Sequence, residues 1–167
     1  MSVLHSKKIL LAVSAGIAAY KAAFLVRGLI KQGAEVRVIM TPDAQHFVTP
    51  LTLSTLSKNP VEWEFFGDKG DWNNHVEYAL WADYMIIAPC TANTLSHMAD
   101  GTCDNLVLAT YLSAKCPVYF APAMDLDMYQ HPTTKNNIDQ LVINGNILIP
   151  AESGELASGL VGEGRMA

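Results

Sequence analysis

The sequence predicts an α/β fold: a three-layer, doubly wound parallel sheet of the Rossmann or flavodoxin type. Short apolar segments rich in β-branched residues recur along the 167 residues and alternate with longer helical segments. These short segments show no polar alternation, which is typical of strands that are covered on both faces in a parallel sheet. Repeated βαβ units are therefore expected, and the chain length favours one domain.

Six strands are expected, each ending at a turn signal. The first, Lys8–Ser14, is a continuous apolar run, and Ala15-Gly16 turns it into a helical segment from Ile17 to Gln32 that Gly33 ends. The other strands are expected at 35–40, 61–66, 84–88, 118–121 and 147–149, with helical segments at 42–57, from 75, at 91–99 and at 105–114. The tail 151–167 has four glycines and no periodicity, so we expect a mobile loop or flap.

Composition argues against several classes of function. The net charge is −5 and the 11 Lys and Arg residues are scattered, which argues against nucleic acid as a partner. No apolar run reaches the ~18 residues of a membrane span, and the signal-like start is better interpreted as strand, loop and helix. Cys90, Cys103 and Cys116 are dispersed, with no CxxC pair and no His at metal-ligand spacing. We therefore expect a cytoplasmic protein without a metal site.

Three strand ends carry side chains that are suited to a phosphate group. In doubly wound sheets, ligands bind at the carboxyl ends of strands, beside helix N-termini with free N–H groups. Ser14 and Gly16 follow the first strand, Thr91, Asn93 and Thr94 follow the fourth, and the segment PAMDLDMY follows the fifth. The first loop lacks GxGxxG, which favours a mononucleotide over a dinucleotide. Tight turns with helix caps are an alternative interpretation of the same residues.

Taken together, five segments resemble the flavin-containing homo-oligomeric cysteine decarboxylases. They are SAGIAAYK (14–21), the histidine that opens HVEYALWAD (75–83), PCTANT (89–94), PAMDLDMY (122–129) and SGELASGLVGEGRM (153–166). The chain is most similar to members that decarboxylate 4′-phosphopantothenoylcysteine to 4′-phosphopantetheine in coenzyme A biosynthesis. The resemblance implies FMN as the cofactor, bound by Ser14, Gly16, Ile17, Thr41, Thr91, Ala92, Asn93 and Thr94.

The resemblance also implies the reaction and the residues that act on the substrate. His75 would accept the proton of a small-molecule thiol while the flavin takes a hydride, which yields a thioaldehyde. The thioaldehyde is an electron sink that lets the neighbouring carboxylate leave as CO2. Met124, Met128 and Arg165 are implied as substrate contacts. Without the resemblance, His75 would be interpreted as an exposed histidine and both methionines as core residues.

The sequence departs from the family pattern at two catalytic positions. Asp125 stands where the motif Pro-x-Met-Asn-x-x-Met-(Trp/Tyr) has an Asn that is taken to hold the substrate carboxylate, which an ionised Asp would repel. Ser158 stands where many members have a Cys that donates a proton from the flap, and a hydroxyl is a much poorer donor than a thiol. Asp125 and Asp127 are alternatively interpreted as caps of a short helix, and the flap as a frayed tail.

Three other functions stay open at this point. The chain is alternatively a peptidyl-cysteine decarboxylase of the same family, a catalytically silent FMN-binding or regulatory protein, or a flavin prenyltransferase, which fits the PAMDLDMY segment less well. Family members assemble as trimers or dodecamers of trimers with flavin at the subunit contact, so a homo-oligomer is implied. Many bacterial members are fused to a C-terminal ligase. Residues 1–167 are accordingly expected to form one flavoprotein domain, with a ligase domain as an additional partner.

Overall fold

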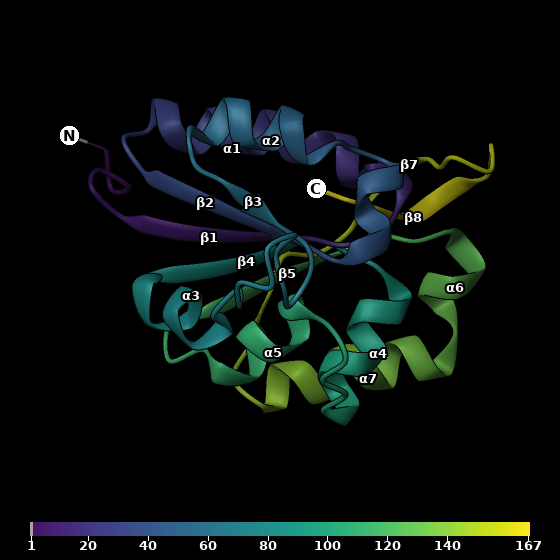
Figure 1. Cartoon of the computed structure of the whole chain (residues 1–167). Coiled ribbons are helices and arrows are strands. Elements are labelled where there is room, and N and C mark those ends of the chain that lie inside the picture. Colours follow the sequence, from purple (N-terminus) through teal and green to yellow (C-terminus); the bar gives the residue numbers. More distant parts are fainter. Residues whose placement is uncertain (1) are drawn as a thin grey trace.

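A six-stranded, wholly parallel sheet forms the centre of the computed structural model, which describes residues 2–167 (Figure 1). The strand order is β3-β2-β1-β4-β5-β6, the order of Rossmann folds, and it confirms the predicted fold class. This order reverses direction between β1 and β4. The strands are β1 (Lys8–Val13), β2 (Glu35–Met40), β3 (Val61–Glu62), β4 (Tyr84–Cys90), β5 (Val118–Pro122) and β6 (Ile147–Leu148).

Helices cover both faces of this sheet and complete the three layers (Figure 1). One face carries α1 (Lys21–Lys31) and α2 (Pro50–Ser57), with the 3-10 turns η1 (Ile17–Tyr20) and η2 (Pro42–His46) at the ends of β1 and β2. The other face carries α3 (His75–Trp81), α4 (Ala92–Asp100), α5 (Leu106–Ser113), α6 (Leu126–Gln130) and α7 (Pro132–Ile143).

The central strand β1 contributes to a separate hydrophobic core on each face. Ile9 and Leu11 pack into the core beneath α1, whereas Leu10 and Ala12 pack into the core beneath α4 and α5. All four side chains are buried, because successive residues of a strand point to opposite faces and both faces are covered. The unbroken apolar run in the sequence reflects this two-sided burial.

Several expected boundaries are wrong. The segment 42–57, expected to be helical throughout, is divided into η2 and α2, and β4 continues beyond residue 88 to Cys90. The segment expected to be one helix begins with the separate 3-10 turn η1 before α1 starts at Lys21. The third strand ends at Glu62, and Phe66 forms only an isolated antiparallel bridge with Trp72. The first strand ends at Val13. The next residue, Ser14, donates its N–H to the Pro89 carbonyl near the end of the neighbouring strand β4. These differences arise at strand ends, where tertiary contacts decide the backbone course.

The glycine-rich tail has regular structure, contrary to the expectation of an irregular loop. It forms an antiparallel hairpin of β7 (Glu152–Glu155) and β8 (Val161–Arg165). The hairpin lies beside α6 (Figure 1), and the Met124 N–H donates a hydrogen bond to the Gly164 carbonyl at 3.0 Å. A Cβ on Gly162 would lie 2.6 Å from Leu126 Cδ1. The absence of side chains at these glycines permits the close contact between the hairpin and the start of α6.

We predict that Gly164→Ala lowers the free energy of unfolding by more than about 1 kcal/mol. Gly164 has φ +147°, and a Cβ there would collide with the Met124 carbonyl oxygen. Gly28→Ala is the matched control, because Gly28 lies in the exposed interior of α1 with open space around its Cα and should gain about 0.5–1 kcal/mol. Urea unfolding monitored by circular dichroism measures both; equal midpoints for Gly164→Ala and the parent would disprove the steric argument.

Candidate active site

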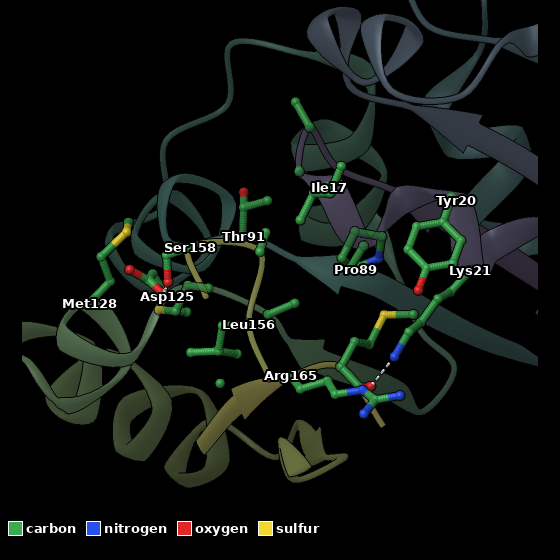
Figure 2. A pocket seen from close by; sticks show the side chains of 18 of the residues that line it. Ile17, Tyr20, Lys21, Pro89, Thr91, Asp125, Met128, Leu156, Ser158 and Arg165 are labelled. Carbon is green, nitrogen blue, oxygen red and sulfur yellow. Dashed lines mark hydrogen bonds between the residues drawn. The ribbon is translucent and has the colours of Figure 1, made fainter. Parts of the chain in front are cut away.

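A cavity of about 720 Å³ lies at the carboxyl edge of the sheet. Its walls come from the segments that follow β1, β4 and β5 and from the β7–β8 hairpin (Figure 2). Three segments that were expected to meet are therefore brought together at the point where the strand order reverses. Of the site residues expected from the sequence, those that line the cavity are Gly16, Ile17, Thr91, Met124, Asp125, Met128, Ser158 and Arg165.

Ser14 joins the ends of β1 and β4. Its hydroxyl donates a hydrogen bond to the Pro89 carbonyl and accepts one from the Thr91 N–H at 3.1 Å. The side chain is fully buried and does not line the cavity. Its observed role is therefore to fix the loop that carries Thr91.

Gly16 and Thr91 lie in close contact where the loops after β1 and β4 meet. A Cβ on Gly16 would lie 3.0 Å from Thr91 Cγ2, so the two loops approach closely because position 16 has no side chain. Thr91 also caps α4, since its Oγ1 accepts a hydrogen bond from the Thr94 N–H at 3.3 Å. Ala92, Asn93 and Thr94 form the first turn of α4 behind Thr91 and do not line the cavity.

Thr41 provides a test of whether this region fits a flavin mononucleotide. Its Oγ1 is buried without a hydrogen-bond partner, although Thr41 occupies the N-cap position of η2. The Thr41 N–H donates to the Val13 carbonyl at 3.0 Å, which places the residue beside the end of β1. An unpaired buried hydroxyl is costly, and a polar atom of a ligand would satisfy it. Thr41 does not line the cavity, so within the cavity the fit to FMN rests on the Gly16 loop and on Thr91 at the N-terminus of α4.

His75 lies outside the cavity of its own chain. It opens α3, whose N-terminus is capped by Asn74, and its ring packs edge-to-face against Trp72 and Phe65 at centroid distances of 5.6 and 6.4 Å. Its Nδ1 is buried and has no hydrogen-bond partner. The chain therefore brings Asp125 and Ser158 together but does not bring His75 to them.

Asp125 and Ser158, the two departures from the family pattern, contact each other. The Ser158 hydroxyl donates a hydrogen bond of 2.6 Å to Asp125 Oδ1 across 33 residues of sequence (Figure 2). Asp125 occupies the N-cap position of α6 and Asp127 lies in its first turn, as the capping interpretation expected, but the Asp125 side chain makes no capping hydrogen bond. This carboxylate faces the cavity and the hairpin instead.

Sequence reasoning missed Lys21, which lines the cavity near Arg165. The Lys21 amine donates a hydrogen bond of 2.7 Å to the Met166 carbonyl. Burial lowers the Lys21 pKa, and the charge of Arg165 lowers it further while Glu152 raises it. Figure 2 shows Lys21 and Arg165 on one side of the cavity and Asp125 on the other. The available signal was the last residue of SAGIAAYK, a lysine at the start of a helix.

Metal-binding and membrane-spanning features were also considered. Among residues 2–167, no group of three or more His, Cys, Asp and Glu side chains comes together in an arrangement that could hold a metal ion. In the same part of the chain, each helix is too short or too polar to cross a bilayer.

The fold and the cavity define an α/β protein with a ligand-sized cavity at the carboxyl edge of its parallel sheet, and comparison with known proteins identifies its family. Residues 2–167 match the family described as Flavoprotein, and the chain belongs to that family. The recognition of a flavoprotein from its sequence segments is thereby confirmed.

Three curated relatives illustrate the range within the family. The chain is 58% identical over 121 residues to a "Cysteine/Cysteine sulfinic acid decarboxylase" of an unknown prokaryotic organism, covering 72% of this chain and 34% of the relative. It is 43% identical to the "Coenzyme A biosynthesis bifunctional protein CoaBC" of Bacillus subtilis, over 98% of this chain and 40% of that protein. It is 47% identical to the "Probable phosphopantothenoylcysteine decarboxylase" of Streptococcus mutans, and the match covers 97% of this chain and 92% of that protein. The chain thus spans well under half the length of the first two.

Two solved structures share the whole fold. A phosphopantothenoylcysteine (PPC) decarboxylase variant complexed with pantothenoylaminoethenethiol superposes with a TM-score of 0.85 at 35% identity, covering 98% of this chain and 92% of that one. The FMN-dependent cysteine decarboxylase SpaF superposes with a TM-score of 0.83 at 29% identity, covering 96% and 92%. These similarities support a flavin cofactor for this chain.

We predict that Ser14→Ala destabilises the protein by about 1–3 kcal/mol, because it leaves the partly buried Thr91 N–H without its acceptor. Ser96→Ala is the control: Ser96 lies in α4, its hydroxyl donates to the Asn93 carbonyl, and its loss should change stability by no more than about 0.5 kcal/mol. Urea unfolding of both variants provides the measurement. A Ser14→Ala variant as stable as Ser96→Ala would show that the bridge between β1 and β4 is dispensable.

Proposed function

We propose that this chain catalyses the FMN-dependent decarboxylation of 4′-phosphopantothenoylcysteine to 4′-phosphopantetheine in coenzyme A biosynthesis. The observation that carries the proposal is the single cavity shared by the Gly16 loop, Thr91, the PAMDLDMY segment and the hairpin. The Streptococcus mutans relative, which this chain matches almost from end to end, supports the same substrate.

In this proposal FMN supplies a two-electron acceptor that later returns the same electrons. The Gly16 loop and the N-terminus of α4 would hold the cofactor, because Gly16 and Thr91 line the cavity, and the Thr41 hydroxyl, buried beside the end of β1, is a further proposed contact. Met124, Met128 and the hairpin residue Leu156 contribute apolar side chains to the cavity lining, which lowers the polarity around the reacting thiol and carboxylate.

His75 is the proposed acceptor of the thiol proton. Its buried Nδ1 has no hydrogen-bond partner within residues 2–167, so this nitrogen is available for a proton. Because His75 lies outside the cavity of its own chain, it would reach the substrate across a contact between two copies. The proposed base thus requires an oligomer.

A homo-oligomer is supported by an apolar strip on η1 and α1. Ile17, Tyr20 and Phe24 are 63%, 52% and 72% exposed, and the first two also line the cavity. Tyr20 and Phe24 border a second cavity of about 530 Å³ that shares Lys21 and Met166 with the first. We propose that this strip is a subunit contact of a trimer or a dodecamer of trimers.

The cellular context is likewise proposed. Cys90, Cys103 and Cys116 are all free thiols, and Cys103 is exposed, which supports a reducing, cytoplasmic location. The bifunctional relatives support a C-terminal ligase domain as a partner of this flavoprotein domain.

A second candidate is the decarboxylation of cysteine itself. The relative that is 58% identical is a cysteine and cysteine sulfinic acid decarboxylase, and Asp125 differs from the Asn that the family pattern assigns to the substrate carboxylate. The two reactions share the thiol, the carboxylate and the cofactor. They differ only in the group attached to the substrate nitrogen.

The decarboxylation is tested by incubating the FMN-loaded chain with 4′-phosphopantothenoylcysteine and measuring the mass of the product by mass spectrometry. Loss of CO2 is expected, and His75→Asn should lower the rate about 10²-fold or more. A product that also lacks two hydrogens would show that Ser158 does not support the return of hydride. Unchanged substrate with bound flavin would refute the enzymatic proposal in favour of a silent flavin-binding protein.

Light scattering coupled to size-exclusion chromatography tests the oligomer. Phe24→Asp should shift the assembly to monomers, because a charge would be buried in the apolar contact. Val142→Asp is the control, since Val142 is 48% exposed on α7 over the opposite face of the sheet. If both variants keep the mass of the parent, the strip around Phe24 is not the subunit contact.

A further inference from the structure

Asp125 is held in place on both its main chain and its side chain. Its carbonyl accepts the first helical hydrogen bond of α6, from the Tyr129 N–H at 2.9 Å. Its Oδ1 accepts the Ser158 hydrogen bond, so the hairpin fixes the carboxylate from the opposite side. Within residues 2–167, no hydrogen bond is formed to Oδ2. Asp125 therefore presents a preorganised acceptor to the cavity.

An Asp at this position selects a different chemical group from an Asn. An Asn amide both donates and accepts hydrogen bonds, and its N–H2 group suits a substrate carboxylate. A carboxylate only accepts and repels another carboxylate, so the group it favours is a donor with positive charge. A charge-assisted hydrogen bond of this kind is roughly twice as strong as a neutral one.

The other charged groups of the cavity complement this acceptor. Lys21 and Arg165 line the cavity on the side away from Asp125 (Figure 2). Glu155 is the second acidic residue of the lining, but it is exposed to solvent, which screens its charge. The cavity thus has an acidic side at Asp125 and a basic side at Lys21 and Arg165, and an ammonium group is attracted to the acidic side.

We propose that Asp125 is a specificity-determining residue that binds the α-ammonium group of unmodified cysteine, so that free cysteine is a substrate of the same cavity. The inference rests on the proposed function for its chemistry. In the net reaction the bond between Cα and the carboxyl carbon breaks, CO2 leaves, and a proton is placed on Cα, giving cysteamine. The two electrons taken from the thiol-bearing carbon are returned to the product, so no further oxidant or reductant is consumed.

The test compares L-cysteine with N-acetyl-L-cysteine, which differ in the charge on nitrogen. For the FMN-loaded chain, kcat/KM for CO2 release should be at least ~10-fold higher with L-cysteine, and Asp125→Asn should reduce that preference at least ~10-fold. Asp127→Asn is the matched control, because Asp127 lies exposed in the same helix and does not line the cavity. Glu155→Gln should leave most of the preference in place.

A binding measurement separates this inference from the proposed function. Calorimetric titration with cysteamine and N-acetylcysteamine, which cannot lose CO2, should show tighter binding of cysteamine to the parent and to Asp127→Asn but not to Asp125→Asn. One outcome is that no CO2 is released from 4′-phosphopantothenoylcysteine, L-cysteine or N-acetyl-L-cysteine, while cysteamine still binds more tightly in the expected variants. In that case the decarboxylase proposal fails and ammonium recognition stands. If Asp125→Asn keeps the parent's preference in both measurements, the role of Asp125 is overturned.

Discussion

The junction between the ends of β1 and β4 is the contact on which the site depends. There the parallel sheet reverses its strand order, and the buried Ser14 hydroxyl bridges the Pro89 carbonyl and the Thr91 N–H. The bridge fixes two loops that approach so closely that a Cβ at position 16 would press against the Thr91 side chain. Because α4 begins at this junction, the orientation of its free N–H groups follows from the same contact. The proposed cofactor region is thus positioned by the ends of the sheet strands.

The hairpin adds the second half of the site by packing on the segment after β5. Backbone contacts between Met124 and Gly164 and the close approach of Gly162 to Leu126 hold it there. Gly162 and Gly164, two of the glycines that indicated a mobile flap, therefore permit close packing on the segment after β5. Ser158 then reaches Asp125, so the hairpin and the segment that carries the proposed substrate contacts are joined by one hydrogen bond.

This contact gives a physical meaning to the two departures from the family pattern. Considered separately, Asp125 weakens the recognition of a carboxylate and Ser158 weakens the donation of a proton. Considered together, they form a hydrogen-bonded pair that aims a carboxylate into a cavity with basic groups on its other side. The two changes are consistent with an altered substrate preference rather than with a loss of catalytic activity.

The sequence by itself determined the fold class, the βαβ units of the sheet and the segments that meet at the cavity. Buried strands such as Lys8–Val13 carry an unbroken apolar run that local pattern reveals, and Gly16 and Thr91 follow such runs directly. Only the tertiary structure decided the contacts between distant residues. The Ser158–Asp125 bond, the hairpin and the separation of His75 from the cavity depend on packing across many residues, which local periodicity does not encode. The same reason explains why Lys21 was missed, since its proximity to Arg165 exists only after folding.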